Sequence, residues 1–418
     1  MRIAILAAGS RGDVQPYVAL GRGLMDAGHR VRVMTTKDHA ALLARHGLEG
    51  CVADLDVQAE LAADSVMESG KLIASFRRMS EIARRGAVAM IAKGLEAAEG
   101  ADAILCGVTG VFVGLALAEK LRVPLVQAYN LPLTPTGAFP GVLLPWMSLV
   151  PRAFFHRLSH RLTRQIVWTT MRSAGDVARQ EVLKLSSAPR LGPFDSGPLG
   201  DGLVLYGYSA CSLPRGPEWG ERIKVTGAWF LGAPSGFVPP PALEAFLARG
   251  PRPVYIGFGS MNSREPEATA RLVFEAARLA GVRVVVSSGW SGLRASAPPE
   301  SAVVVGDVPH DWLFERVAAI VHHGGAGTTA AALRAGVPSM AIPFHGDQPF
   351  WAGRSAGLGV GPAPIPRRRL SSENLAVALR ALVSDDGALR RAADLGARVR
   401  SERGVEEAIE AIEALPRR

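Results

Sequence analysis

The stretch VHHGGAGTTAAALRAGVPSMAIPFHGDQ, residues 321–348, decides the fold that we expect for this chain. An apolar run, residues 317–321, ends in two histidines and a glycine-rich turn, and an alanine-rich helical segment follows. A strand that enters a helix through glycines leaves backbone N–H groups exposed at the helix N-terminus, where the helix dipole also favours an anion. The stretch therefore predicts a strand–turn–helix unit with a phosphate site at its turn.

A second short apolar stretch, residues 339–344, leads directly to Asp347 and Gln348. Because ligands bind at the carboxyl ends of parallel strands, we expect these two side chains near the histidine turn. A carboxylate and an amide are suitable hydrogen-bonding partners for the hydroxyls of a sugar. The combination indicates a sugar-nucleotide site.

The composition is that of a globular protein with more than one domain. The chain has 418 residues, of which 48% are hydrophobic and 20% charged, and this length favours two or three domains. Its three cysteines are far apart, which argues against a disulfide framework or a zinc site and favours the reducing cytoplasm. Residues 1–13 read as a first strand rather than a signal peptide, and the apolar tract 103–118 reads as strand–turn–helix rather than a membrane span.

The net charge of +9 does not by itself indicate a nucleic-acid partner. No stripe of Lys and Arg alternates with aromatic residues, so we expect none. The densest basic segment, residues 151–172, is favoured as a solvated amphipathic helix. An apolar acceptor wall or a weak membrane-surface contact is the alternative for this segment. The sequence does not determine the oligomeric state.

The chain reads as two halves with the same alternation of strands and helices. Strands are predicted at residues 2–8 and 30–36, with a helix at 16–27 between them, and the second half repeats this pattern from residue 253. Residues 231–241 are rich in Gly and Pro and are interpreted as a linker. We therefore predict an α/β protein with two doubly wound, Rossmann-like domains, residues 1–230 and 242–418, which face each other across a cleft. Residues 371–415 should be helical throughout.

Three motifs together resemble one enzyme family. The segments GSRGDVQPYVALGRGL (9–24), DVPHDWLF (307–314) and HHGGAGTT through GVPSMAIPFHGDQ (322–348) stand in the order of the family's acceptor loop and donor signature. They resemble the GT-B fold UDP-glycosyltransferases, in the branch of bacterial antibiotic glycosyltransferases and sterol 3-β-glucosyltransferases. The resemblance covers nearly the whole chain and implies a hexosyltransferase, with glucose as the expected sugar.

The resemblance also implies roles for individual residues. Contacts to the donor diphosphate would come from His323, Gly325, Gly327, Thr328 and Ser260. The sugar hydroxyls would be held by Asp347 and Gln348, and the nucleobase by Val308 and Trp290. Trp290 could equally be a core residue. The plant branch carries a ribose-binding glutamate where this chain has Ala331, so the choice between a UDP-sugar and a TDP-sugar stays open.

The resemblance assigns the general base to Asp13. The alternative is that Asp13 only caps the helix that follows it. A base on one domain and a sugar on the other imply single-step inversion at the anomeric carbon. No metal or other cofactor is expected, because the pair Asp54 and Asp56 lies far from the donor signature and His156 and His160 have no evident third ligand.

The acceptor is only loosely constrained by the sequence. Phe112 and Trp146 lie in apolar tracts that suit a hydrophobic small molecule such as a natural product, although these tracts can also be ordinary core. Two other functions remain: a sterol or lipid glucosyltransferase at a membrane surface, and a sugar-nucleotide epimerase or hydrolase of the same fold. The remaining histidines His29, His39 and His46 are expected at the surface near helix ends.

Overall fold

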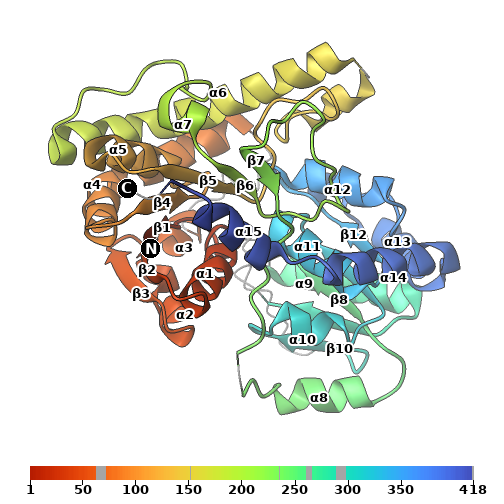
Figure 1. The fold of residues 1–418 in the computed structure, drawn as a ribbon. Coiled ribbons are helices and arrows are strands. Elements are labelled where there is room, and N and C mark those ends of the chain that lie inside the picture. Colours follow the sequence, from red (N-terminus) through yellow and green to blue (C-terminus); the bar gives the residue numbers. More distant parts are fainter. Residues whose placement is uncertain (63–71, 151, 235, 260–265, 289–297, 417–418) are drawn as a thin grey trace.

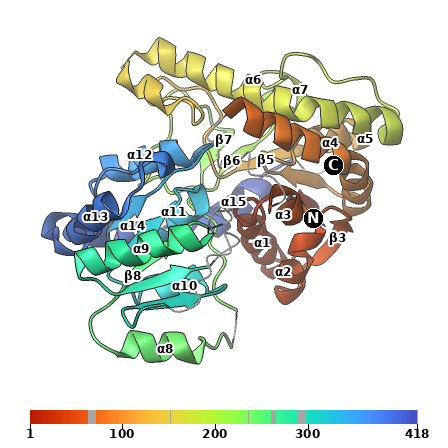
Figure 2. The same ribbon diagram turned by 180° about the vertical axis from the view of Figure 1, so that it is seen from behind.

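A computed structural model describes residues 1–62, 72–150, 152–234, 236–259, 266–288 and 298–416. The chain forms two α/β halves, each built on a sheet of parallel strands, and the halves lie side by side (Figure 1). The turned view shows the same two sheets, each covered by helices (Figure 2). The predicted fold class is confirmed.

The N-terminal half is built on a seven-stranded sheet in the order β3-β2-β1-β4-β5-β6-β7, and every neighbouring pair is parallel. Its strands, in chain order, are β1 (Arg2–Leu6), β2 (Arg30–Thr36), β3 (Glu49–Ala53), β4 (Ala103–Cys106), β5 (Leu125–Tyr129), β6 (Val204–Tyr206) and β7 (Ile223–Val225). Its helices are α1 (Arg11–Asp26), α2 (Ala40–Arg45), α3 (Val57–Ala62), α4 (Leu72–Ala97), α5 (Val111–Leu121), α6 (Ala153–Ala178) and α7 (Gly197–Asp201), with the short turns η1 (Lys37–His39), η3 (Pro145–Leu149) and η4 (Arg179–Leu183).

The C-terminal half has a five-stranded parallel sheet in the order β10-β9-β8-β11-β12. Its strands are β8 (Val254–Gly257), β9 (Val284–Ser287), β10 (Ala302–Val305), β11 (Ala319–His322) and β12 (Ser339–Ala341). The helices of this part of the chain are α8 (Pro241–Ala248), α9 (Pro266–Ala280), α10 (His310–Phe314), α11 (Ala326–Ala335), α12 (Gln348–Gly357), α13 (Ser372–Ser384), α14 (Asp386–Arg400) and α15 (Gly404–Glu413), and η5 (Arg367–Arg369) precedes α13.

Each sheet has one point where the direction of strand order reverses. In the first sheet this point lies between β1 and β4, and in the second it lies between β8 and β11. A crevice opens outside the carboxyl ends of the strands at such a point, because the connecting helices there run to opposite faces of the sheet. Asp13 follows β1 and His323 follows β11, so both lie at these positions.

The helix α1 begins five residues earlier than the sequence pattern predicted. Its N-cap is Ser10, and Asp13 in the first turn accepts a hydrogen bond from the Ser10 backbone N–H. This reciprocal cap satisfies helix donors before the apolar periodicity starts. Pro16 lies inside the helix and lacks an N–H, so the Gly12 carbonyl instead accepts a hydrogen bond from Asn130 Nδ2 (3.1 Å).

The end of the chain returns to the first half. The predicted helical segment 371–415 consists of three helices, and the last one, α15, packs on α1 (Figure 1). Its Ala408, Ile409 and Ile412 share one buried apolar cluster with Leu20 and Leu24 of α1. The helix α15, at the end of the expected C-terminal domain of residues 242–418, thus packs on the first half, and the chain crosses between the halves twice.

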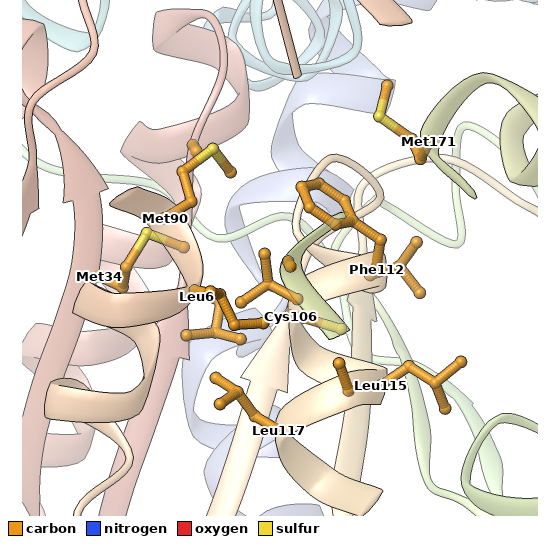
Figure 3. Close-up of a cluster of buried hydrophobic side chains, with 14 of the residues drawn as sticks. Leu6, Met34, Met90, Cys106, Phe112, Leu115, Leu117 and Met171 are labelled. Carbon is orange, nitrogen blue, oxygen red and sulfur yellow. The ribbon is translucent and has the colours of Figure 1, made fainter. Parts of the chain in front are cut away.

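The core of the N-terminal half lies between its sheet and helices α4, α5 and α6. Leu6, Cys106 and Leu117 are completely buried there, and Figure 3 shows them with neighbouring methionines and Phe112. Long apolar strands buried on both faces are typical of a parallel sheet covered by helices. This core supports the loops after β1 and β4, where the candidate site lies.

Candidate functional site

A cavity of about 1110 Å³ lies between the two halves. Its walls include the segments that follow β1, β4 and β5 of the first sheet and β8, β10, β11 and β12 of the second. The carboxyl ends of both sheets thus line one space. This volume exceeds the usual range for a single small ligand and is sufficient for two.

Asp13 lies on the N-terminal side of this cavity. Its Oδ2 accepts hydrogen bonds from the Ser10 backbone N–H (2.9 Å) and from Ser10 Oγ (2.7 Å). In the described part of the chain no protein group bonds Oδ1. Burial raises the pKa of Asp13, and the two Ser10 hydrogen bonds oppose that rise. The carboxylate therefore caps its helix with one oxygen and has a second oxygen for another partner.

His323 and the N-terminus of α11 form the opposite wall. His323, Gly325, Gly327 and Thr328 all line the cavity, as expected. Burial lowers the pKa of His323 to about 4, so the ring is neutral at neutral pH and donates one hydrogen bond. A Cβ on Gly325 would lie 2.4 Å from His323 Nε2, so the close approach of ring and backbone requires glycine there.

The loop after β12 brings an acid beside this wall. Asp347 is the N-cap of α12, and burial raises its pKa to about 6, with a further contribution from the charge of Asp13. The charge of Asp13, in the first half, thus acts on Asp347 in the second half. Gln348 also lines the cavity, but its side-chain oxygen accepts hydrogen bonds from the Phe344 and His345 N–H groups (2.8 and 3.3 Å) and fixes the loop.

The other predicted site residues divide into three groups. Val308 and Phe112 are buried and line the cavity. Ser260 and Trp290 lie outside the described residues. Trp146 is 58% exposed on η3 and is not among the lining residues, so the described cavity does not support its predicted contact with an acceptor.

One histidine differs from its expected surroundings. His39 was expected at the surface, and this is wrong: it is 3% exposed, because η1 turns its ring under the loop after β1, where Nε2 contacts the Gly9 carbonyl. His322 is completely buried, whereas His310 and His345 line the cavity. His156 and His160 each bond a backbone carbonyl, Gly137 O and Phe139 O.

The described residues contain no group of three or more metal-ligating side chains. Asp56 Oδ1 accepts a hydrogen bond from the Ala59 N–H at the start of α3, and Asp54 faces Lys37 Nζ at 3.5 Å. These two acids thus have local structural partners. Within the same residues, no helix is both long enough and apolar enough to cross a bilayer.

The sequence reading missed the side chains that hold the loop before Asp13. Thr109 Oγ1 donates to Ala8 O, His39 Nε2 to Gly9 O and Asn130 Nδ2 to Gly12 O. These residues follow β4, β2 and β5, so their position after a strand was the one available signal. Arg11 of the first half also forms an ion pair with Asp307 of the second, and both residues line the cavity.

Two doubly wound sheets that share one cavity at their carboxyl ends define the GT-B class of glycosyltransferase folds. Residues 3–140 match the Glycosyltransferase family 28 N-terminal domain. Residues 273–415 match the erythromycin biosynthesis protein CIII-like C-terminal domain. The chain belongs to the family of nucleotide-sugar-dependent glycosyltransferases that includes sterol 3-beta-glucosyltransferases and antibiotic glycosyltransferases.

The sequences of curated relatives align with nearly the full length of this chain. Two sterol 3-beta-glucosyltransferases of Arabidopsis thaliana are each 34% identical over 98% of the chain, which covers 65% and 67% of their own lengths. One from Neosartorya fischeri is 36% identical over 99% of the chain, which covers 29% of that protein. The chain thus spans about two thirds of the plant relatives and less than a third of the fungal one.

Solved structures show the same fold. The calicheamicin glycosyltransferase has a TM-score of 0.70 at 20% identity, over 99% of this chain and 98% of that chain. The glycosyltransferase VinC, solved in complex with DTDP, has a TM-score of 0.68 at 19% identity, over 99% of both chains. At this level of identity the likeness concerns the fold alone.

Proposed function

We propose that this protein is an inverting glycosyltransferase. It would move a hexose, glucose by likeness to the plant relatives, from a UDP-sugar or TDP-sugar to a hydroxyl of a hydrophobic small molecule. One observation carries the proposal: Asp13, His323 and Asp347 line one cavity, and the charge of Asp13 contributes to the raised pKa of Asp347.

The C-terminal wall suits a nucleotide diphosphate sugar. The N–H groups at the start of α11 and the neutral His323 can donate to diphosphate oxygens, which carry the negative charge that develops when the sugar leaves. We propose that these donors stabilise the diphosphate without a metal ion. Asp347 would accept hydrogen bonds from sugar hydroxyls.

Asp13 would act as the general base. The acceptor O–H gives its proton to Oδ1 while its oxygen attacks the anomeric carbon, and the bond from that carbon to the diphosphate oxygen breaks. Because burial raises the pKa of Asp13, the carboxylate is a stronger base than an exposed aspartate. An attack opposite the leaving group converts an α-linked donor into a β-linked product, and closure of the halves would exclude water.

The N-terminal part of the cavity suits an apolar acceptor. Its lining side chains come from α4, α5, α6 and the loop before η3 and are almost all apolar: Phe76, Met79, Ile82, Met90, Phe112, Val142, Leu143 and Met171. Met90, Phe112 and Met171 also border the core drawn in Figure 3, so acceptor wall and core are continuous. Such a wall favours a polyketide, terpenoid or sterol over a hydrophilic acceptor.

The substitution Asp13→Asn tests this function. Asparagine keeps an oxygen for the Ser10 hydrogen bonds, so the melting temperature should stay near that of the wild type. Loss of the base should reduce kcat by about 10²–10⁴-fold. The assay uses UDP-glucose and TDP-glucose against a panel of apolar alcohols, with NMR of the product. Wild-type kcat in the variant, or an α-linked product, would overturn the mechanism.

An assay with the donor alone addresses the remaining enzyme class. An epimerase or hydrolase would convert the nucleotide sugar without any acceptor. Turnover of the donor that does not increase when an acceptor is added would contradict the proposed transfer.

A surface patch favours a second candidate, a glucosyltransferase that takes a sterol or lipid acceptor at a membrane. The patch consists of Trp146 and Leu149 on η3 and Phe154 on α6, which are 58%, 84% and 68% exposed, together with the exposed Arg152 and Arg161. Among the described residues neither arginine has an ion-pair partner. Exposed apolar groups beside cationic ones are typical of contact with an anionic membrane surface. The patch adjoins Val142 and Leu143, which line the acceptor part of the cavity.

Co-sedimentation with vesicles tests this candidate. Vesicles of phosphatidylcholine with phosphatidylserine should bind the wild type, and Leu149→Ser with Phe154→Ser should weaken that binding by at least about tenfold, since burial of two large apolar side chains is lost. Val377→Ser, an exposed apolar residue on α13, is the control. The membrane candidate would be eliminated if the double variant bound vesicles as well as the wild type and the Val377→Ser control.

A further inference from the structure

The loop that carries Asp13 is held by side chains from three neighbouring strand ends. Thr109 Oγ1 donates to Ala8 O (2.5 Å), His39 Nε2 to Gly9 O (2.9 Å) and Asn130 Nδ2 to Gly12 O (3.1 Å). Three carbonyls of the loop and of the start of α1 are thus fixed by side chains from other parts of the chain.

The loop conformation at Gly9 depends on such external support. Gly9 has φ of +124°, and a Cβ there would lie 2.8 Å from Asp13 Oδ2. This backbone conformation is open to glycine and costly for other residues. A flexible residue at this point also loses more conformational freedom on ordering, so the loop is not fixed by its own sequence.

His39 and Asp13 are joined through a single peptide group. The Gly9 carbonyl accepts from His39 Nε2, and the N–H on the other side of that same peptide, Ser10 N, donates to Asp13 Oδ2 (2.9 Å). Because a carbonyl only accepts, the proton of His39 lies on Nε2. Hydrogen bonds in series polarise the group they share, so the first bond strengthens the second.

The surroundings of His39 are buried and acidic. Its ring is 3% exposed, and its Nε2 is 3.4 Å from Oδ2 of Asp38, which is itself buried. Asp38 Oδ2 in turn accepts from the Gln58 N–H (3.3 Å). Asp38 on η1 and Asp13 on α1 are charged groups near His39, and the charge of His39 lowers the pKa of Asp13.

We propose that His39 is a positioning residue for Asp13. By its hydrogen bond to Gly9 O it holds the Gly9–Ser10 peptide in the orientation that binds Asp13 Oδ2 and leaves Oδ1 facing the cavity. The inference rests on the proposed function, in which Asp13 Oδ1 takes the acceptor proton. His39 touches neither substrate nor reacting atom, and it acts through one peptide group.

The test compares two substitutions at this position in the full-length enzyme, with a third in reserve. His39→Leu removes the donor and nearly preserves volume, whereas His39→Gln keeps an N–H within reach of Gly9 O. His39→Leu should lower kcat by about 10–100-fold, as expected for a misplaced base, with little change in KM for the donor. If this variant does not fold, His39→Asn, which retains an amide but is too short to reach Gly9 O, replaces it.

The pH profile separates positioning from mere stability. A weaker Ser10 hydrogen bond should shift the acid limb of kcat/KM to higher pH in His39→Leu, and His39→Gln should restore most of it. His156→Leu is the matched control, because His156 is also buried and donates to a backbone carbonyl, Gly137 O at 2.9 Å, away from the cavity lining. It should lower the melting temperature and leave the acid limb in place.

Each outcome decides one question. An unchanged acid limb in His39→Leu overturns the positioning role, and so does an equal shift in the Leu and Gln variants, which would reflect the charge of His39 rather than its hydrogen bond. Asp13→Asn is measured in parallel. If Asp13→Asn keeps wild-type kcat, the general base itself is wrong, whereas an inactive Asp13→Asn with unaltered His39 variants refutes only the inference.

Discussion

At the scale of single residues, the site depends on acids and histidines whose pKa values are altered by burial. His323 is neutral at neutral pH, because burial lowers its pKa to about 4. Asp347 has a pKa of about 6, so it ionises only near neutrality, beside Asp13. Groups with altered pKa values in a cavity are typical of functional sites. Here they also imply a cost in stability that donor binding would offset.

The substitution Asp347→Asn should reveal this cost. The pKa of Asp347 is higher in the folded state than its usual 3.8, so the folded state binds the proton more tightly and stability falls as pH rises from about 4 through 6. Above pH 6 the wild type retains the full penalty of a buried charge. Asp347→Asn should therefore raise the free energy of unfolding by about 1–3 kcal/mol at pH 8, and by about half as much at pH 5.

Urea unfolding at the two pH values measures the effect, and donor kinetics provide the functional readout. The KM for the nucleotide sugar should increase if Asp347 holds the sugar. A variant that is less stable than the wild type at pH 8 would contradict the electrostatic account.

At the scale of elements, the C-terminal wall of the cavity depends on close contact between the turn after β11 and the His323 ring. Gly325 approaches Nε2, and Gly259 after β8 approaches Cε1, where an added Cβ would be 2.7 Å away. Glycines from two neighbouring strand ends thus enclose one imidazole. The ring orientation is therefore set by backbone rather than by side-chain partners.

The substitution Gly325→Ala should displace that ring. The added methyl group would overlap Nε2 at 2.4 Å, so KM for the donor should increase by at least about tenfold, the effect of losing one hydrogen bond to a charged group. The double variant with His323→Ala tests the cause. Because the clash disappears in that background, Gly325→Ala should add little to the loss caused by His323→Ala. Additive losses would show that Gly325 acts independently of the ring.

At the scale of the whole molecule, the two halves are tied together at their edges. The chain crosses between β7 and α8 and again near Glu402, whose Oε1 accepts from Ser209 Oγ (2.7 Å). After the second crossing α15 covers α1, where a Cβ on Gly23 would meet Val405 Cγ1 at 2.4 Å. The helix that carries Asp13 at its start is thus packed against the last helix of the chain.

Two glycine substitutions inside helices should have opposite effects on stability. Alanine favours a helix interior by about 1 kcal/mol over glycine. Gly353→Ala in α12 meets no atom within 4 Å and should gain up to this amount. Gly23→Ala should instead push α15 from α1 and lose about 1–3 kcal/mol. Denaturant unfolding of both variants provides the comparison, and a stabilised Gly23→Ala would show that α15 is not tightly docked.

The sequence by itself determined the class of the fold, and it placed Asp13, His323 and Asp347 after β1, β11 and β12. It could do so because period-two and helical patterns, glycine turns and the alternation of strands and helices along the chain can be read from the sequence. Parallel strands then bring their carboxyl ends to one edge of the sheet. Only the tertiary structure decided which side chains cooperate. The burial of His39 under the loop of Asp13, the effect of the Asp13 charge on the pKa of Asp347, and the return of α15 to the first half each join residues far apart in the chain. The exposure of Trp146 was also decided by the tertiary structure. Burial and pKa depend on those distant neighbours, and no local pattern records them.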